Sequence, residues 1–278
     1  MATFRIPLPG DYSPRYALRY MSRDPESVSE RGDTRSFAKA LLIDGKPSVV
    51  RVDFADSRAR VSCDARRSAV EPTVLRLLGL PFDPAPFEAK HRRLVGPRRG
   101  MRVPQTATVF ESIVWAICGQ QVNLAFAFKL RRAVIELAGK RVDSMHAHPD
   151  PAAVARLDYD DLTRRQFSRR KAEYLIDVAR SGMDFEGRWE SGDGSRERGV
   201  LVSQLPSPIS PLLSPDSLLA IRGFGIWSVN YVLMRRCRRL RPGRRQRIDF
   251  VAAGVLQTRN ASRRREDAGA DEAFCAIP

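Results

Sequence analysis

One segment near residue 220 constrains the fold of this chain more than any other: an apolar run, two glycines separated by one residue, and a second apolar run. Ser214 and Pro215 are typical of a helix start, and Gly223 and Gly225 are expected to end that first helix. The second helix is expected to run to about Cys237. A tight turn of this kind leaves backbone N–H groups free at the start of the second helix, so it can hold a phosphate. Short glycine motifs are weak signals, and a helix–helix turn without a ligand is the competing interpretation.

The N-terminal part of the chain has a different pattern, because short β-favouring runs alternate with turn residues. Asp44-Gly45 stands between two such runs and predicts a tight hairpin. We therefore expect an N-terminal α+β domain with an antiparallel sheet over residues 1–88. Its expected elements are strands at 35–43, 46–54 and 58–63 and helices at 16–21 and about 72–80.

From Pro104 onward apolar residues recur every three or four positions, which predicts helices with one buried face. We expect a mostly helical domain over residues 89–257, and the fold class is therefore α+β. The glycine- and proline-rich stretch 186–211 is long for a loop and predicts a flexible insertion. Residues 258–278 are polar, with no helical period, and predict a disordered or altered tail. The other expected helices cover 110–137, 151–157, 159–165 and 168–180.

The chain is strongly basic: its 48 lysines and arginines outnumber 32 acids and give a formal charge of +16. A polyanionic partner is expected from this charge, although genomic base composition can also enrich arginine.

Four scattered cysteines favour neither disulfides nor a metal site. His146-Ala147-His148 reads as a polar loop before Pro149. Without a long apolar run or a secretion signal, the chain is expected to be soluble and cytoplasmic.

Several segments together resemble the helix-hairpin-helix DNA glycosylases, and most closely the AlkA type, DNA-3-methyladenine glycosylase II. The resemblance covers roughly residues 4–257. It rests on the Gly223-Phe224-Gly225 hairpin with Trp227 and Asn230-Tyr231, on the later Asp249, and on the segments 110–122 and 168–175. It implies base excision repair of alkylated, 3-methyladenine-like purines in double-stranded DNA, by a monomer that requires no cofactor.

The resemblance assigns the catalytic role to Asp249, which follows Gly225 by 24 residues. Breaking an N-glycosidic bond develops positive charge on the sugar, so a carboxylate there stabilises the transition state and orients water. Asp249 can also cap the short apolar run that follows it, and the two roles are compatible. Relatives that also cut the strand carry a lysine where this chain has Trp227. Tryptophan forms no Schiff base, so the resemblance implies base removal without strand cleavage.

Three further roles are implied by the resemblance. Trp227 and Tyr231 line the base pocket, where their π faces suit an electron-poor purine, with structural packing as the competing role. Gln121 stands at the position of the wedge that fills the gap left by the flipped base, where many relatives have leucine. Gly223, Phe224 and Gly225 hold a DNA phosphate, either directly or through a bound monovalent cation.

The chain also departs from the pattern of this family. Arg222 replaces a usual proline, and the residues after Gln257 lack the aromatic helices that complete the pocket in relatives. Two functions therefore stay open. The first is a monofunctional glycosylase, and the second is a non-catalytic helix-hairpin-helix DNA-binding protein.

Overall fold

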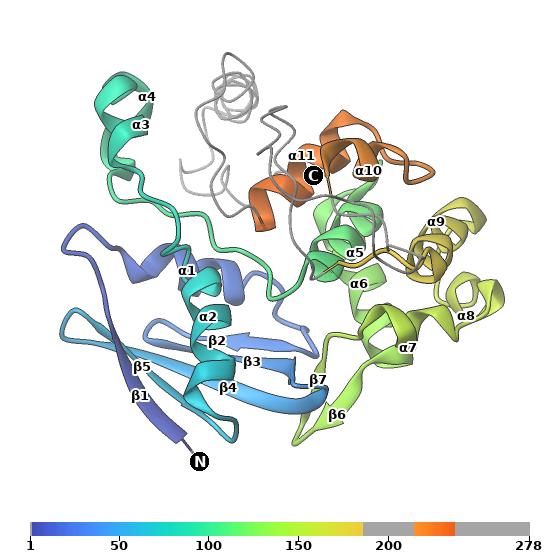
Figure 1. Ribbon diagram of the computed structural model, residues 1–278, viewed down its shortest axis with the longest axis horizontal. Helices are drawn as coiled ribbons and strands as arrows, with labels where there is room; N and C mark the ends of the chain where they lie inside the picture. The colour runs from blue at the N-terminus through green and yellow to red at the C-terminus, as the bar shows by residue number, and fades with distance from the viewer. Residues whose placement is uncertain (1, 186–213, 237–278) are drawn as a thin grey trace, which may run out of the picture.

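The computed structural model describes residues 2–185 and 214–236 of the chain (Figure 1). The predictions about the 186–211 stretch, Cys237, Asp249 and the 258–278 tail lie outside these residues. One face of the molecule is an antiparallel sheet, and helices fill the space above it, which confirms the α+β class.

The N-terminal sheet has five antiparallel strands in the order β1-β5-β4-β3-β2. The β3–β4 turn was predicted: Asp44 and Gly45 both have positive φ, 49° and 74°, as a two-residue hairpin turn requires. The two outer strands were not predicted: β1 pairs with the distant strand β5, and β2 has only three residues, Glu30–Gly32, with no β-favouring pattern. The strands are β1 (Ala2–Pro7), β2 (Glu30–Gly32), β3 (Ser36–Ile43), β4 (Lys46–Ala55) and β5 (Arg58–Cys63).

Two helices, α1 (Pro14–Met21) and α2 (Arg67–Leu77), pack their apolar residues into a core shared with the sheet. The expected start of α2 at Pro72 was wrong, because Pro72 lies inside the helix. Proline removes one backbone hydrogen bond there but does not end the helix.

A projecting segment follows, made of α3 (Ala85–Lys90), α4 (Arg92–Val95) and the short 3-10 helix η1 (Gly96–Arg98). The boundary between two domains at residue 88 stays a proposal.

The helical half is built around α5 (Val109–Gly119), all of whose residues are buried. It begins at Thr108, whose side chain accepts a hydrogen bond from the Glu111 amide. It packs against α6, α9 and α11. The remaining elements are α6 (Leu124–Ala138), β6 (Lys140–Val142), β7 (Met145–Ala147), α7 (Pro151–Ala155), α8 (Tyr159–Thr163), α9 (Arg169–Arg180), α10 (Pro215–Leu219) and α11 (Ile226–Arg236).

A buried cluster of four charges joins the sheet to the helices. Lys39 of β3 contacts Glu30 of β2 and lies 2.6 Å from Glu111 of α5. Arg131 of α6 lies 3.0 Å from both carboxylates, and no side chain in the cluster is more than 2% exposed. Burial alone would raise the pKa of both carboxyls, but Lys39 and Arg131 outweigh it and hold each pKa below its usual range. The cluster is therefore fully ionised and internally neutralised.

His148 lies beside this cluster, and the expectation of a polar loop there was wrong. His146 is part of β7, and His148 is 6% exposed, with its Nδ1 3.0 Å from the Pro149 carbonyl oxygen. Burial lowers the pKa of His148 to about 4, although the Glu111 carboxylate opposes the shift. The histidine is therefore neutral at physiological pH.

This buried histidine predicts a loss of stability in mild acid. The unfolded chain binds a proton on His148 below pH 6.5, whereas the folded chain binds it only near pH 4. The free energy of unfolding should therefore fall as the pH drops through this window, by about 2 kcal/mol at pH 5 from this residue alone. Urea unfolding at about pH 7.5 and about pH 5 measures the effect. The variant His148→Gln should lose less stability over the same interval, and an equal loss in both proteins would rule out this cause.

Candidate DNA-binding and base-recognition site

The helix-hairpin-helix that the sequence predicts is present. The Ser214 side chain accepts a hydrogen bond from the Ser217 amide (3.0 Å), and the Ser217 hydroxyl accepts one from the Ser214 amide (2.7 Å), so α10 begins with a reciprocal cap. Gly223 has φ +82°, and a Cβ at this position would overlap the ring of Tyr174 in α9. Only glycine fits this turn. Gly225 precedes α11, whose first amides have no acceptor within the helix and are suited to bind an anion.

Two side chains hold the hairpin in position, a role that was not predicted from the sequence. Gln120, which follows α5, donates from Nε2 to the Gly223 carbonyl oxygen (2.9 Å) and to Ser228 Oγ (3.3 Å). Arg222, which replaces the usual proline, lies 3.4 Å from Glu173 of α9 and over the Tyr174 ring. The turn is thus tied both to the end of α5 and to α9. Phe224 contributes its backbone to the turn, while its side chain is buried in the helical core.

Gln121 lies next to the hairpin, because the adjacent Gln120 is bonded to it. Gln121 is exposed and has φ +54°, a left-handed conformation that is uncommon for a residue with a side chain. It stands between α5 and α6 on the surface. An exposed side chain in this position is compatible with a wedge, and that role stays a prediction.

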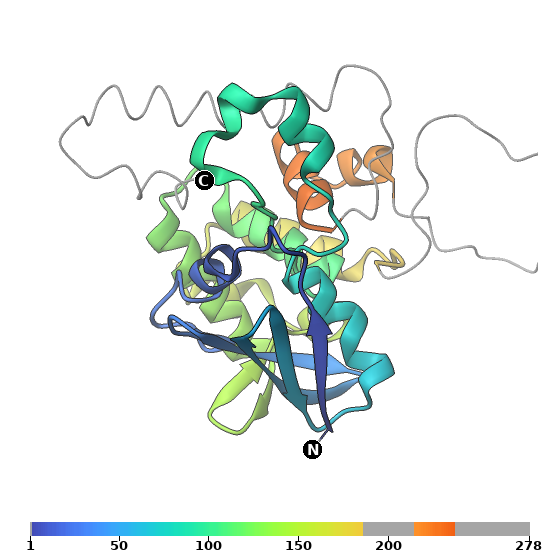
Figure 2. The same cartoon turned by 90° about the vertical axis from the view of Figure 1, so that its left-hand side faces the viewer.

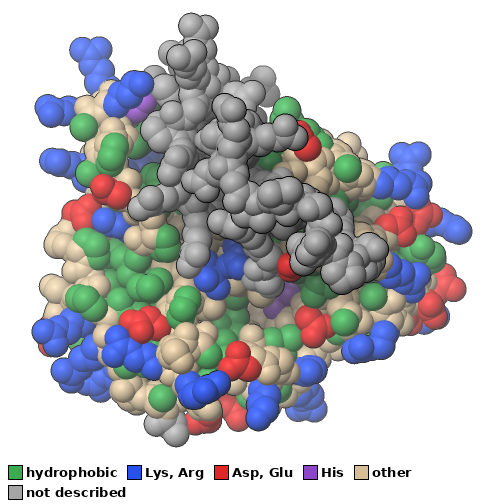
Figure 3. All heavy atoms as spheres, viewed as in Figure 1, with side chains coloured by type: hydrophobic (Ala, Val, Ile, Leu, Met, Phe, Trp, Pro, Cys, Tyr) green, Lys and Arg blue, Asp and Glu red, His purple; other side chains and the backbone are tan. Residues whose placement is uncertain are grey.

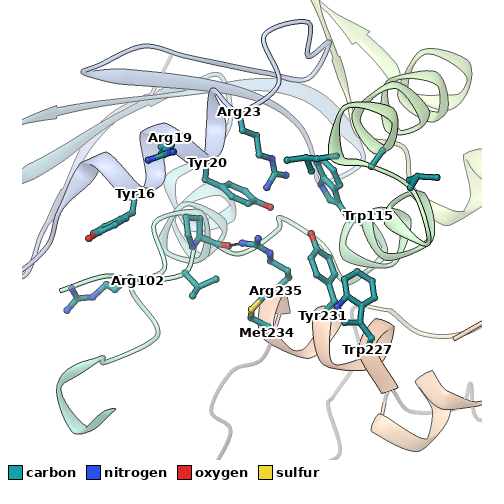
Figure 4. A pocket seen from close by; sticks show the side chains of 16 residues that line it. Tyr16, Arg19, Tyr20, Arg23, Arg102, Trp115, Trp227, Tyr231, Met234 and Arg235 are labelled. Carbon is teal, nitrogen blue, oxygen red and sulfur yellow. Dashed lines mark hydrogen bonds between the residues drawn. The ribbon is translucent and has the colours of Figure 1, made fainter. Parts of the chain in front are cut away.

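A pocket of about 120 Å³ lies between α1, α5 and α11 (Figure 4). Trp227 and Tyr231, predicted as a pair, both line it, and their rings stack with centroids 5.5 Å apart and an interplanar angle of 24°. Trp115 of α5 and Tyr20 of α1 form further aromatic walls. Sequence reasoning missed these two, because neither stands near the hairpin in the chain.

The pocket is basic as well as aromatic. The Arg23 guanidinium carbon lies 3.6 Å from the Tyr20 ring centroid and 4.2 Å from that of Trp115. Arg235 lies 4.4 Å from the Tyr20 ring centroid and donates to the Pro104 carbonyl oxygen (2.7 Å). Burial would raise the pKa of Tyr20, but these two guanidiniums outweigh it and lower the pKa. Among the described residues that line the pocket, none is a carboxylate.

The structure brings Trp227 and Tyr231 together in one pocket and places Gln121 beside the hairpin. Asp249 lies outside the described residues, so its assignment stays a prediction. Over residues 2–185 and 214–236 no group of three side chains is arranged to bind a metal ion. Within the same residues no helix is long and apolar enough to cross a bilayer.

Comparison with known protein families identifies the family to which this chain belongs. Residues 114–258 match the HhH-GPD superfamily of base excision DNA repair proteins, a segment that includes Gln121, the hairpin and Trp227. The chain belongs to this superfamily. It is 30% identical over 214 residues to the DNA-3-methyladenine glycosylase of Bacillus subtilis (strain 168). That alignment covers 73% of this chain and 65% of the relative, so the chain spans less than two thirds of its length.

Two further proteins extend the comparison. DNA-3-methyladenine glycosylase 2 of Escherichia coli (strain K12) is 26% identical over 244 residues, which cover 84% of this chain and 80% of that protein. The solved structure of the 3-methyladenine DNA-glycosylase from Archaeoglobus fulgidus superposes with a TM-score of 0.65 at 19% identity, over 94% of this chain and 92% of that one. The structural likeness shows a shared fold.

Proposed function

We propose that this HhH-GPD protein is a DNA glycosylase of base excision repair that releases alkylated, 3-methyladenine-like purines from double-stranded DNA. The observation that supports it best is the aromatic pocket containing Trp227 and Tyr231, which opens beside a hairpin suited to bind a phosphate. A base inside the duplex cannot reach such a pocket, so the nucleotide must be flipped out. The relatives named DNA-3-methyladenine glycosylases support the purine class.

In the proposed mechanism the first amides of α11 hold a phosphate, directly or with a monovalent cation. Gln121 enters the stack in place of the flipped base. Arg23 already covers the faces of Tyr20 and Trp115, and Arg235 lies 5.5 Å from the Tyr231 ring centroid. The base is therefore expected to stack on Trp227, with Tyr231 as the wall behind it. Asp249 stabilises the positive charge that develops on the sugar and orients water.

The proposed reaction stops at base removal. A strand-cutting glycosylase needs an amine nucleophile that forms a Schiff base with the sugar, and this chain has Trp227 at the corresponding position. Among the described residues no lysine lines the pocket, and Lys171 of α9 donates to the Cys118 carbonyl oxygen (2.9 Å). Incubation with duplex DNA that carries one alkylated purine tests both parts: free base should appear while the strand stays intact.

Replacement of Trp227 by alanine should slow base release by about 5- to 150-fold, because stacking of a base on an aromatic ring contributes about 1–3 kcal/mol. Single-turnover release of free base measures the effect. Tyr159→Ala in α8 is a suitable control, since Tyr159 is 37% exposed and does not line the pocket. Equal rates in the Trp227→Ala variant and the unsubstituted protein would show that Trp227 only packs.

The Gln121→Gly variant tests the predicted wedge role of Gln121 separately from the contribution of this residue to the stability of the turn. Glycine adopts the observed positive φ without strain, so the free energy of unfolding should stay the same or rise by about 1 kcal/mol. Release of a modified purine from a fully paired duplex should fall, because nothing fills the gap in the stack. Release of the same purine placed opposite an abasic site should fall less, since that base is already unpaired. Equal loss on both substrates would contradict a wedge role.

A further inference from the structure

The projecting segment between the two cores, residues 85–99, carries a dense group of positive charges, and we call it the basic arm. In Figures 1 and 2 its helices α3 and α4 rise at the end of the molecule that also carries α10 and α11, away from the sheet. Lys and Arg side chains crowd its outer surface in Figure 3. Its exposed cations are Lys90, Arg92, Arg93, Arg98 and Arg99.

The base of the arm is fixed to the rest of the protein. Glu88 accepts a hydrogen bond from the Gly100 amide (2.6 Å), and Gly100 has φ +70° where it passes the Asp11 backbone closely. Just beyond it, Arg102 lies 3.0 Å from the Asp11 carboxylate, and Val95 is buried within the arm. The arm therefore presents its charges in a defined place.

These charges are not neutralised in the way that other exposed arginines of the chain are. Arg67 pairs with Glu71 and Arg169 with Glu173, each one helical turn away. In the arm, Arg99 lies 3.9 Å from Glu88, which is already bonded to the Gly100 amide. Across the part of the chain that the structure describes, the other four cations lie within 4 Å of no carboxylate. Uncompensated charge of one sign favours an anionic partner.

The arm and the hairpin lie on different sides of the same pocket. The extended segment that leaves the arm, Arg102 to Pro104, lines the pocket, and α11, which begins at the hairpin, lines it too. A duplex with one base in the pocket and a phosphate at the hairpin therefore passes close to the arm. We propose that the basic arm binds DNA backbone phosphates on the side of the flipped base away from the hairpin. This inference rests on the proposed function of the pocket.

The test removes positive charge from the arm and compares the effect on DNA binding with that of an equal loss of charge elsewhere on the surface. The arm variant carries Arg92→Gln, Arg93→Gln, Arg98→Gln and Arg99→Gln. The control carries Arg5→Gln, Arg51→Gln, Arg58→Gln and Arg60→Gln, four exposed arginines of the sheet. Fluorescence anisotropy measures binding of a duplex with an uncleavable flipped nucleotide at about 50 to 200 mM salt. All eight side chains are exposed, so the unfolding temperature of both variants should match the unsubstituted protein.

The arm variant should bind at least about tenfold more weakly, and its slope of log K against log salt should decrease by about 2 to 4. The control should stay within about twofold of the unsubstituted protein. If both variants lose affinity equally, or if the arm variant binds as tightly as the unsubstituted protein, the inference is overturned while the proposed function stands. If the unsubstituted protein binds no duplex at any of these salt concentrations, the proposed function fails, and the role of the arm fails with it.

Discussion

Replacing Lys39 by methionine should lower the free energy of unfolding by about 3–5 kcal/mol. Methionine fills the space of the lysine stem but leaves Glu30 and Glu111 with one partner fewer in a site that water does not reach. Two buried carboxylates that share only Arg131 repel each other and lose hydrogen bonds. Urea unfolding measures the difference directly.

Lys46→Met is a matched control for this substitution, because Lys46 is exposed at the start of β4 in the same hairpin. It should change the free energy of unfolding by less than about 0.5 kcal/mol. Similar losses in the two variants would mean that the buried cluster does not hold the sheet against the helices.

Asp249→Asn should reduce the rate of base release by about 10²- to 10³-fold, because an amide carries no negative charge to stabilise the sugar cation. DNA binding should persist, since the substitution removes a negative charge from a protein that binds a polyanion. Asp216→Asn is the matched control: Asp216 is exposed in α10 and has no proposed part in the chemistry. Release that is unaffected in the Asp249→Asn variant would overturn the assignment of this acid and leave the glycosylase function standing.

The features predicted correctly from the sequence are those in which a few adjacent residues determine the backbone. Asp44-Gly45 predicts a two-residue turn because both positions need positive φ. Ser214 marks the start of the first hairpin helix for a similar local reason, but the prediction that the glycines end this helix was wrong: α10 ends at Leu219, and Gly223 lies in the turn beyond it. The spacing of Trp227 and Tyr231 places them one turn apart on one helix, and their rings do stack.

The features that were missed depend on contacts between distant segments. Glu30, Lys39, Glu111 and Arg131 form one ion cluster, yet each alone reads as an ordinary charged residue. Tyr20 contributes a wall of the pocket although more than 200 residues separate it from Tyr231. Nothing in the local pattern distinguishes such residues from solvent-exposed ones. Asp249, which the family resemblance identified, lies outside the described residues and stays a prediction.

Release of free base tests most directly whether this chain removes a damaged purine from DNA. Purified protein is incubated with duplex DNA that carries 3-methyladenine, 7-methylguanine, hypoxanthine or ethenoadenine, and the products are separated by chromatography. We expect free 3-methyladenine, an abasic strand that breaks only after treatment with alkali, and loss of release in the Asp249→Asn variant. Tight, salt-sensitive binding of these duplexes with no base released from any of them would contradict it, and would identify the chain as a DNA-binding member of the superfamily without catalysis.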